Sequence, residues 1–167
     1  EPNRLLPHLH LPKSDGTTID IDLVMIARTG IYVFESKNFS GCIFGDEDSR
    51  YWTQTMKRGP KQQFYNPIWQ NESRISSLKR QLALEADAFK SYVVFSDQCT
   101  LKKMYVRSGR VKVMNRSMIV REIIKDMAEL PDIFTPLEIN QIYSELVPYT
   151  HTAAAIEQAR IETVRLE

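Results

Sequence analysis

At 167 residues the chain is long enough to bury a hydrophobic core, and we expect one domain over residues 1–167. Hydrophobic residues make up 43% and charged residues 26%, as is usual for a globular protein, and no apolar run approaches the length of a membrane span. The two cysteines have neither zinc-ligand spacing nor the number that a disulfide framework needs, and the net charge of +1 alone points to no partner. We therefore expect a cytoplasmic protein that does not bind membranes.

The N-terminal segment, residues 1–16, carries three prolines and ends on Ser14-Asp15-Gly16, which is typical of a turn. Three leucines in it, Leu5, Leu9 and Leu11, predict a short first strand. The chain begins with Glu-Pro-Asn and not with Met, so we expect it to be an excerpt of a longer protein with other domains.

A β-hairpin follows. Two apolar runs of strand length, Ile21–Ala27 and Ile31–Phe34, are separated by Arg28-Thr29-Gly30, a short segment of the kind that closes a hairpin. Strands that are hydrophobic on both faces belong inside a sheet covered by helices. The sequence therefore predicts that this hairpin lies in the core of the domain.

Polar residues mark the open end of the hairpin. Because side chains alternate along a strand, Glu35 and Lys37 share a face. Two registers are open: turn residues Thr29-Gly30 place Asp22 opposite Lys37, and turn residues Arg28-Thr29 place it opposite Glu35. Both put the three polar groups on one face.

A buried Asp, Glu and Lys is costly unless something compensates the charge. A divalent metal on the two carboxylates, with the lysine directed at a phosphate or a water, would do so. A plain salt bridge at a strand end is the structural alternative. Asp20, two residues before Asp22 and on its face, is a second candidate for the first carboxylate.

Further strands and a basic loop are predicted next. Phe39–Phe44 and Tyr51–Thr55 have the length and composition of strands. Lys57–Phe64 is basic and polar, and Gly59-Pro60 interrupts it, so we expect a mobile loop over the site.

A long amphipathic helix is predicted from Asn66-Pro67, a capping residue and a first-turn proline, to about Asp87. Its apolar positions recur at helical spacing: Ile68, Ile75, Leu78 and Leu82. Gln70 and Arg74 are among its polar positions. The apolar run Tyr92–Ser96 then predicts a central parallel strand reached by a crossover.

The last third predicts strands Leu101–Val106 and Val111–Val113 around a basic turn, and then helices. Ser117–Leu130 is expected to bury Ile119, Ile123, Ile124 and Met127, and Pro136–Val147 to bury Leu137, Ile139, Ile142 and Leu146. Ala153–Leu166 is helical by propensity, so we interpret residues 131–167 as a C-terminal helical extension of the same domain. The fold class is α/β, with a mixed central sheet flanked by helices.

Positive charge is concentrated in two segments. Residues 50–82 hold seven Lys/Arg and one acid, and residues 102–125 hold eight Lys/Arg and one acid. Such segments are typical of a polyanion-binding face, although a solvated surface without a partner is the alternative. The residues that we expect to contact nucleic acid are Lys57, Arg58, Lys61, Arg74, Arg107, Arg110 and Lys112.

An ordered set of motifs extends this interpretation. Asp22, Gly30, Glu35-Ser36-Lys37-Asn38 and Ser40-Gly41 are followed by Ile43, Gly45, Trp52, Asn66-Pro67-Ile68 and Gln70-Asn71. This set resembles the NERD (nuclease-related domain) family, a branch of the restriction-endonuclease-like PD-(D/E)xK superfamily. The resemblance covers roughly Leu5 to Leu84 and favours Asp22 over Asp20.

The resemblance implies a restriction-endonuclease-like fold and a metal-dependent nuclease acting on DNA, an endonuclease or nickase rather than an exonuclease. It implies that Mg²⁺, for which Mn²⁺ substitutes, is held by Asp22, Glu35 and the carbonyl of Ser36. Lys37 would orient or deprotonate the attacking water or bind developing charge, and Gln70 would lie near the site.

Members of the family usually carry a glutamate on a helix before the first strand, and this sequence lacks that helix. A catalytically inactive nucleic-acid-binding module is therefore one alternative. A protein-interaction module, whose basic segments contact an acidic partner, is the other. The sequence allows a homo-oligomer.

Overall fold

The computed structural model describes residues 3–150 and residue 161. Its larger sheet has five strands in the order β1-β2-β3-β7-β9. These are β1 (Arg4–Pro12), β2 (Thr18–Ala27), β3 (Gly30–Lys37), β7 (Phe89–Phe95) and β9 (Val111–Asn115). The first three strands are antiparallel neighbours, whereas β7 runs parallel to both β3 and β9. The predicted mixed central sheet, with its first strand, hairpin and parallel crossover strand, is confirmed.

The hairpin register is the second of the two that the sequence allowed. Ala27 pairs with Gly30, so only Arg28 and Thr29 form the turn. Leu23 pairs with Phe34, and the same register continues to place Asp22 across from Glu35. The chain thus brings both carboxylates to one end of the central sheet.

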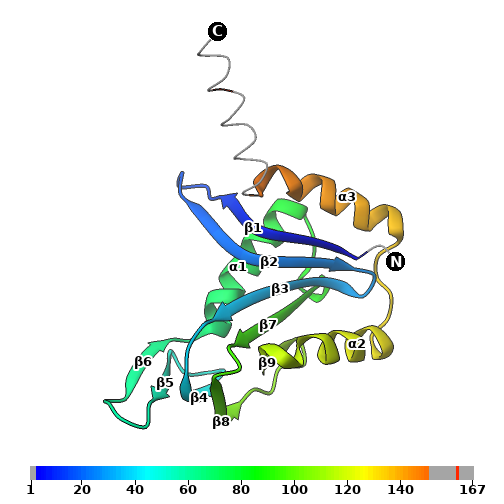
Figure 1. Ribbon diagram of the computed structural model, residues 1–167. Helices are drawn as coiled ribbons and strands as arrows, with labels where there is room; N and C mark the ends of the chain where they lie inside the picture. The colour runs from blue at the N-terminus through cyan, green and yellow to red at the C-terminus, as the bar shows by residue number, and fades with distance from the viewer. Residues whose placement is uncertain (1–2, 151–160, 162–167) are drawn as a thin grey trace.

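A second sheet of four strands, in the order β6-β5-β4-β8, was not predicted. It contains β4 (Gly41–Asp46), β5 (Tyr51–Thr55), β6 (Gln62–Tyr65) and β8 (Cys99–Tyr105). Because Gln62–Tyr65 pairs with β5, the predicted loop Lys57–Phe64 is wrong for its last part, and residues 56–61 form the connection. Figure 1 shows β3 ending beside the first turn of α1, with the small sheet beyond that end.

Three α-helices of the described residues cover the larger sheet: α1 (Pro67–Leu82), α2 (Ile119–Glu129) and α3 (Pro136–Leu146). Helices α1 and α3 pack against the face that carries Ile31 and Val33. Helix α2 packs against the opposite face, which carries Tyr32 and Phe34. The expected α/β class, with helices flanking mixed sheets, is therefore confirmed.

Some details of the predicted helices are wrong. Helix α1 ends at Leu82 and not near Asp87, because Ala83 adopts a left-handed conformation that stops it. Ile124 and Leu137 were expected in the core, yet they are 63% and 67% exposed. Each helix buries one narrow stripe, and these two residues lie outside it. Of the predicted C-terminal helix, residues 153–160 and 162–166 lie outside the described residues.

Candidate active site

Glu35 is a buried carboxylate near the carboxyl end of β3. It follows four buried apolar residues on that strand, which lies between β2 and β7. Alternation puts Glu35 on the same face as Ile31 and Val33, under α1, and leaves it 4% exposed. A carboxylate is rarely buried to this extent without a partner of opposite charge.

Two cations supply that charge. Lys37 Nζ lies 3.3 Å from Glu35 Oε1, as expected from their shared strand face. Arg74 Nη1 lies 2.8 Å from Glu35 Oε2, although the contact is outside hydrogen-bond geometry. Arg74 is held in place by a second contact, because its Nε donates to the carbonyl of Asp20 at 2.7 Å. Each oxygen of Glu35 therefore faces one cation.

The environment nevertheless favours the protonated form of Glu35. Burial raises the pKa of its carboxyl, the charges of Arg74 and Lys37 lower it, and the nearby Asp22 raises it. The net pKa lies above the ordinary glutamate value. Loss of hydration thus outweighs the two cations, so one further positive charge would stabilise the ionised carboxylate.

Asp22 is the second carboxylate of the cluster. It is exposed, and its Oδ2 accepts a hydrogen bond from the backbone N–H of Ser36 at 3.2 Å. Asp20, the other candidate, turns its side chain to a different partner: its Oδ1 lies 2.7 Å from Nδ1 of His10. The side chain of Asp22 thus contacts the end of β3 that carries Glu35 and Lys37. The side chain of Asp20 contacts His10 instead.

The start of α1 is fixed at this site by asparagines. Asn66 caps the helix by accepting from the N–H groups of Ile68 and Trp69. Asn71 is fully buried, and its amide donates to the carbonyl of Val33 and to Oγ of Ser91. These bonds tie the first turns of α1 to β3 and β7, next to Glu35.

Gln70 and Arg74 project from this anchored part of α1. They line a groove of about 320 Å³ together with Ile19, Tyr65, Trp69 and Ser73. Oε1 of Gln70 is buried and has no hydrogen-bond partner in the part of the chain that the structure describes. A buried acceptor without a partner costs free energy unless a ligand, ion or water satisfies it.

The chain was compared with known protein families. Residues 1–96 match the nuclease-related domain family, and this range contains the whole Asp22–Glu35–Lys37–Gln70 cluster. The chain belongs to the NERD family. An uncharacterized protein of Bacillus anthracis is 35% identical over 99 residues, which cover 59% of this chain and 46% of that protein. The chain thus spans less than half the length of this relative, and no solved structure matches.

The family assignment agrees with the architecture. Mixed sheets flanked by helices, with a D…ExK arrangement at the end of a central hairpin, make this NERD domain restriction-endonuclease-like. Residues 97–150 lie outside the family match and supply β8, β9, α2 and α3.

The side chains at the carboxyl end of β3 are suitable ligands for a hard divalent cation. Asp22 and Glu35 offer carboxylate oxygens, and Oε2 of Glu35 has no hydrogen bond among the described residues. Over residues 3–150 and 161 no group of three or more His, Cys, Asp or Glu side chains is placed to hold a metal. Two carboxylates suit Mg²⁺, which keeps several waters in its shell, better than Zn²⁺, which takes three or four protein ligands.

The expected nucleic-acid contacts are spread over the molecule. Lys57, Arg58 and Lys61 are exposed between β5 and β6, and Arg107 is exposed in the β8–β9 loop. Lys112 points to the face covered by α2 and forms ion pairs with Glu122 and Asp126 at 2.8 and 2.7 Å. The structure does not bring Lys112 to Glu35.

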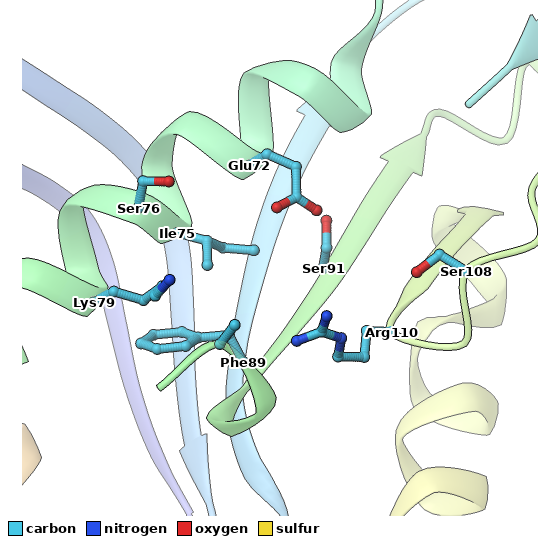
Figure 2. Close-up of a pocket in the computed structure, with 9 residues that line it drawn as sticks. Glu72, Ile75, Ser76, Lys79, Phe89, Ser91, Ser108 and Arg110 are labelled. Carbon is cyan, nitrogen blue, oxygen red and sulfur yellow. The ribbon is translucent and has the colours of Figure 1, made fainter. Parts of the chain in front are cut away.

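Arg110 lines a separate pocket. This pocket, of about 100 Å³, lies between α1 and the β8–β9 loop, and Figure 2 shows the guanidinium of Arg110 pointing into it beside Ser91 and Phe89. Glu72 and Lys79 of α1 form its opposite wall. Arg110 thus lines a different hollow from the one that Gln70 and Arg74 line.

Sequence reasoning missed that Arg74 contacts Glu35. The sequence places Arg74 among general nucleic-acid contacts, but the structure puts it on the buried carboxylate. Helical spacing carried the signal, because residues four apart lie on one helix face and Gln70 was already expected near the site.

Proposed function

We propose that this NERD domain is a metal-dependent nuclease that hydrolyses DNA phosphodiester bonds. The observation that carries the proposal is the buried Glu35 carboxylate with Lys37 and Arg74 on its two oxygens and Asp22 beside it. Such a cluster, beside a groove and with a perturbed carboxyl pKa, is more typical of a catalytic site than of a stabilising ion pair.

Within this proposal Asp22, Glu35 and the main-chain carbonyl of Ser36 hold Mg²⁺ or Mn²⁺. The ion, when bound, lowers the pKa of a coordinated water and neutralises charge on the phosphate. Lys37, whose ammonium already lies at the carboxylate, positions the attacking water or stabilises the negative charge that develops on phosphorus oxygens. Gln70 offers its unsatisfied amide oxygen to the attacking water.

The direct test is incubation of supercoiled, linear and single-stranded DNA with the protein in Mg²⁺, Mn²⁺ or EDTA. Nicked or linear products from supercoiled DNA, formed with Mg²⁺ or Mn²⁺ and absent with EDTA, support an endonuclease or nickase. If no substrate is cut with either metal, while the protein still binds DNA, the nuclease proposal is wrong.

Arg74→Gln is expected to tighten divalent-metal binding, because Arg74 and the ion compete for Oε2 of Glu35. We expect the affinity to rise roughly tenfold, which corresponds to about 1.4 kcal/mol. Titration calorimetry with Mn²⁺ measures the change. Arg80→Gln, on the same helix and without a contact to Glu35, is the matched control. Weaker binding would show instead that Arg74 orients the carboxylate for the metal.

The basic connection between β5 and β6 is expected to hold the phosphate backbone without selecting sequence. Replacing Lys57, Arg58 and Lys61 by Gln should weaken binding to unrelated duplexes about equally. The slope of log K against log salt should fall by about 0.9 for each phosphate that the variant no longer neutralises. Fluorescence anisotropy at several salt concentrations measures both. Lys125→Gln, exposed on α2, is the control, and unchanged affinity of the triple variant would show a merely solvated surface.

A nucleic-acid-binding module that cleaves nothing is the second candidate. It is favoured by one observation: each oxygen of Glu35 already faces a side-chain cation, so the carboxylate has two positive partners without a metal. Metal-dependent cleavage separates the two functions. A protein-interaction domain would instead bind DNA weakly and without a steep salt dependence.

The cellular location, the further domains and the oligomeric state of the protein are also proposals. No helix of the described residues is long and apolar enough to cross a membrane. We propose a cytoplasmic protein in which this domain is joined to others and can form a homo-oligomer.

A further inference from the structure

Three aromatic side chains form an exposed row at the edge of the small sheet. Tyr51 and Tyr65 are direct partners across β5 and β6, with ring centres 6.5 Å apart and planes at 82°. Tyr65 and Trp69, in the first turn of α1, are 6.0 Å apart with planes at 76°. We call these three residues the aromatic row. It joins the small sheet to the helix that carries Gln70 and Arg74.

The aromatic row is not part of the core. Tyr51, Tyr65 and Trp69 are 50%, 40% and 36% exposed. The neighbouring Trp52 points the other way along β5 and is buried, stacked at 16° on Phe95. Alternation thus divides the aromatics of β5 into an inner side chain that stabilises the fold and an outer one that meets solvent.

The row leads to the active site. Tyr65 and Trp69 line the same groove as Gln70 and Arg74, and Arg74 reaches Glu35 at 2.8 Å. A ligand lying in this groove would touch the two aromatic rings and Arg74, whose guanidinium lies at Oε2 of Glu35. The indole ring of Trp69 is fixed in position, because its N–H donates to the carbonyl of Glu47 at 2.9 Å.

The charge around the row suits a polyanion. Arg50 lies over the Tyr51 ring at 5.6 Å, and Arg74 lines the groove together with Tyr65 and Trp69. The carboxylate of Glu47, in the turn before β5, accepts with both oxygens from the backbone N–H groups of Arg107 and Ser108. A guanidinium therefore lies beside the row at Tyr51, and another lies in the groove that Tyr65 and Trp69 line.

We propose that the aromatic row binds unpaired bases of single-stranded DNA and directs that strand into the groove toward Glu35. This inference rests on the proposed function and names its substrate class. Exposed aromatic faces beside basic side chains are the arrangement on which unpaired bases stack, because every base has a π-face and the cations hold its phosphate. Bases in a duplex are stacked on each other and present only their edges in the grooves.

Binding is measured in EDTA, where no cleavage takes place, by anisotropy of labelled probes about 12 nucleotides long, within the span that one strand-binding domain covers. The probes are oligo-dT, an abasic strand with the same phosphates, and a duplex of equal length. The wild-type protein is expected to bind oligo-dT at least about tenfold more tightly than the abasic strand, since only oligo-dT has bases that can stack on the rings. Equal affinity for oligo-dT and the abasic strand, or tighter binding of the duplex, would overturn the inference without any variant.

Variants then locate the effect. Tyr65→Leu and Trp69→Leu, which keep apolar bulk, are each expected to lower oligo-dT affinity by about tenfold and to leave abasic binding unchanged. Tyr105→Leu, an exposed tyrosine on β8 outside the row, is the matched control. Circular dichroism confirms that each variant folds. An undiminished oligo-dT affinity in folded Tyr65→Leu and Trp69→Leu would place base stacking elsewhere and contradict the proposal.

This outcome is separable from that of the nuclease proposal. Base-dependent binding that is lost in the variants, together with an absence of cleavage in Mg²⁺ and Mn²⁺, would leave the aromatic row as a strand-binding surface and refute the nuclease. Metal-dependent cleavage together with equal binding of oligo-dT and the abasic strand would refute only the aromatic row.

Discussion

Lys37→Ala is expected to lower the DNA-cleavage rate by about 10²–10⁴-fold while the protein stays folded. The reason is that Lys37 Nζ lies at Oε1 of Glu35, where a positioned ammonium acts on the attacking water or on charge that develops in the transition state. Single-turnover cleavage of supercoiled DNA at saturating Mg²⁺ measures the rate, and thermal unfolding checks the fold.

The fold should tolerate this change because Lys37 contributes to the sheet through its backbone. Its carbonyl accepts from the N–H of Ser96 at 3.0 Å, and this bond does not depend on the side chain. Glu35 keeps its contact with Arg74 in the variant. Lys125→Ala, on the exposed side of α2, is the control. A wild-type cleavage rate in folded Lys37→Ala protein would remove Lys37 from the mechanism.

Local chemistry explains why much of the fold was predictable. The central hairpin, the parallel strand β7 and the capped start of α1 all depend on residues close together in the chain. Alternation then placed Glu35 and Lys37 on one face. These features needed no knowledge of distant segments.

The hairpin register, by contrast, is decided by distant segments. The carbonyl of Arg28 accepts from the N–H groups of Ile133 and Phe134, which holds Arg28 in the turn. Gly30 has a φ of +149°, and a Cβ there would lie 2.9 Å from the carbonyl oxygen of Ala88. Neither interaction is visible in the local sequence, so both registers stayed open.

The second sheet and the role of Arg74 were missed for the same reason. β8 pairs with β4 across more than fifty residues, in a parallel arrangement that no turn signals. The contact between Arg74 and Glu35 needs α1 to lie over β3, which Asn71 secures through the carbonyl of Val33. Which partner meets a polar side chain is thus settled by how the layers pack, not by composition.

Glu35→Gln is expected to abolish cleavage and metal binding and yet to stabilise the metal-free protein at neutral pH. The first two effects follow from the proposed function, in which Glu35 is a metal ligand. The third follows from burial, which raises the pKa of Glu35 in spite of Arg74 and Lys37. Glutamine resembles the protonated carboxyl and avoids the cost of burying its charge. We expect a gain of about 0.5–2 kcal/mol in the free energy of unfolding.

The pH dependence gives this prediction its sign. Because the folded pKa of Glu35 is raised, the folded state binds more protons than the unfolded chain between the two pKa values. In the wild-type protein, the contribution of Glu35 to the free energy of unfolding is fully present below the pKa that it has in the unfolded chain. This contribution is lost as the pH rises through its pKa in the folded protein. The variant, always neutral here, keeps its stability, so the difference should be absent near about pH 3.5 and largest at neutral pH, where urea unfolding in EDTA measures it.

Two comparisons make the result decisive. Glu129→Gln, exposed on α2, should change stability little at any pH. Mn²⁺ should stabilise the wild-type protein and not Glu35→Gln, because only a state that binds the ion gains from it. If ion pairing with Arg74 and Lys37 outweighs burial, Glu35→Gln will instead lose stability at neutral pH, by as much as ~3–5 kcal/mol for a broken buried pair. That sign would make Glu35 a structural ion-pair partner and remove the energetic reason for a metal at this carboxylate.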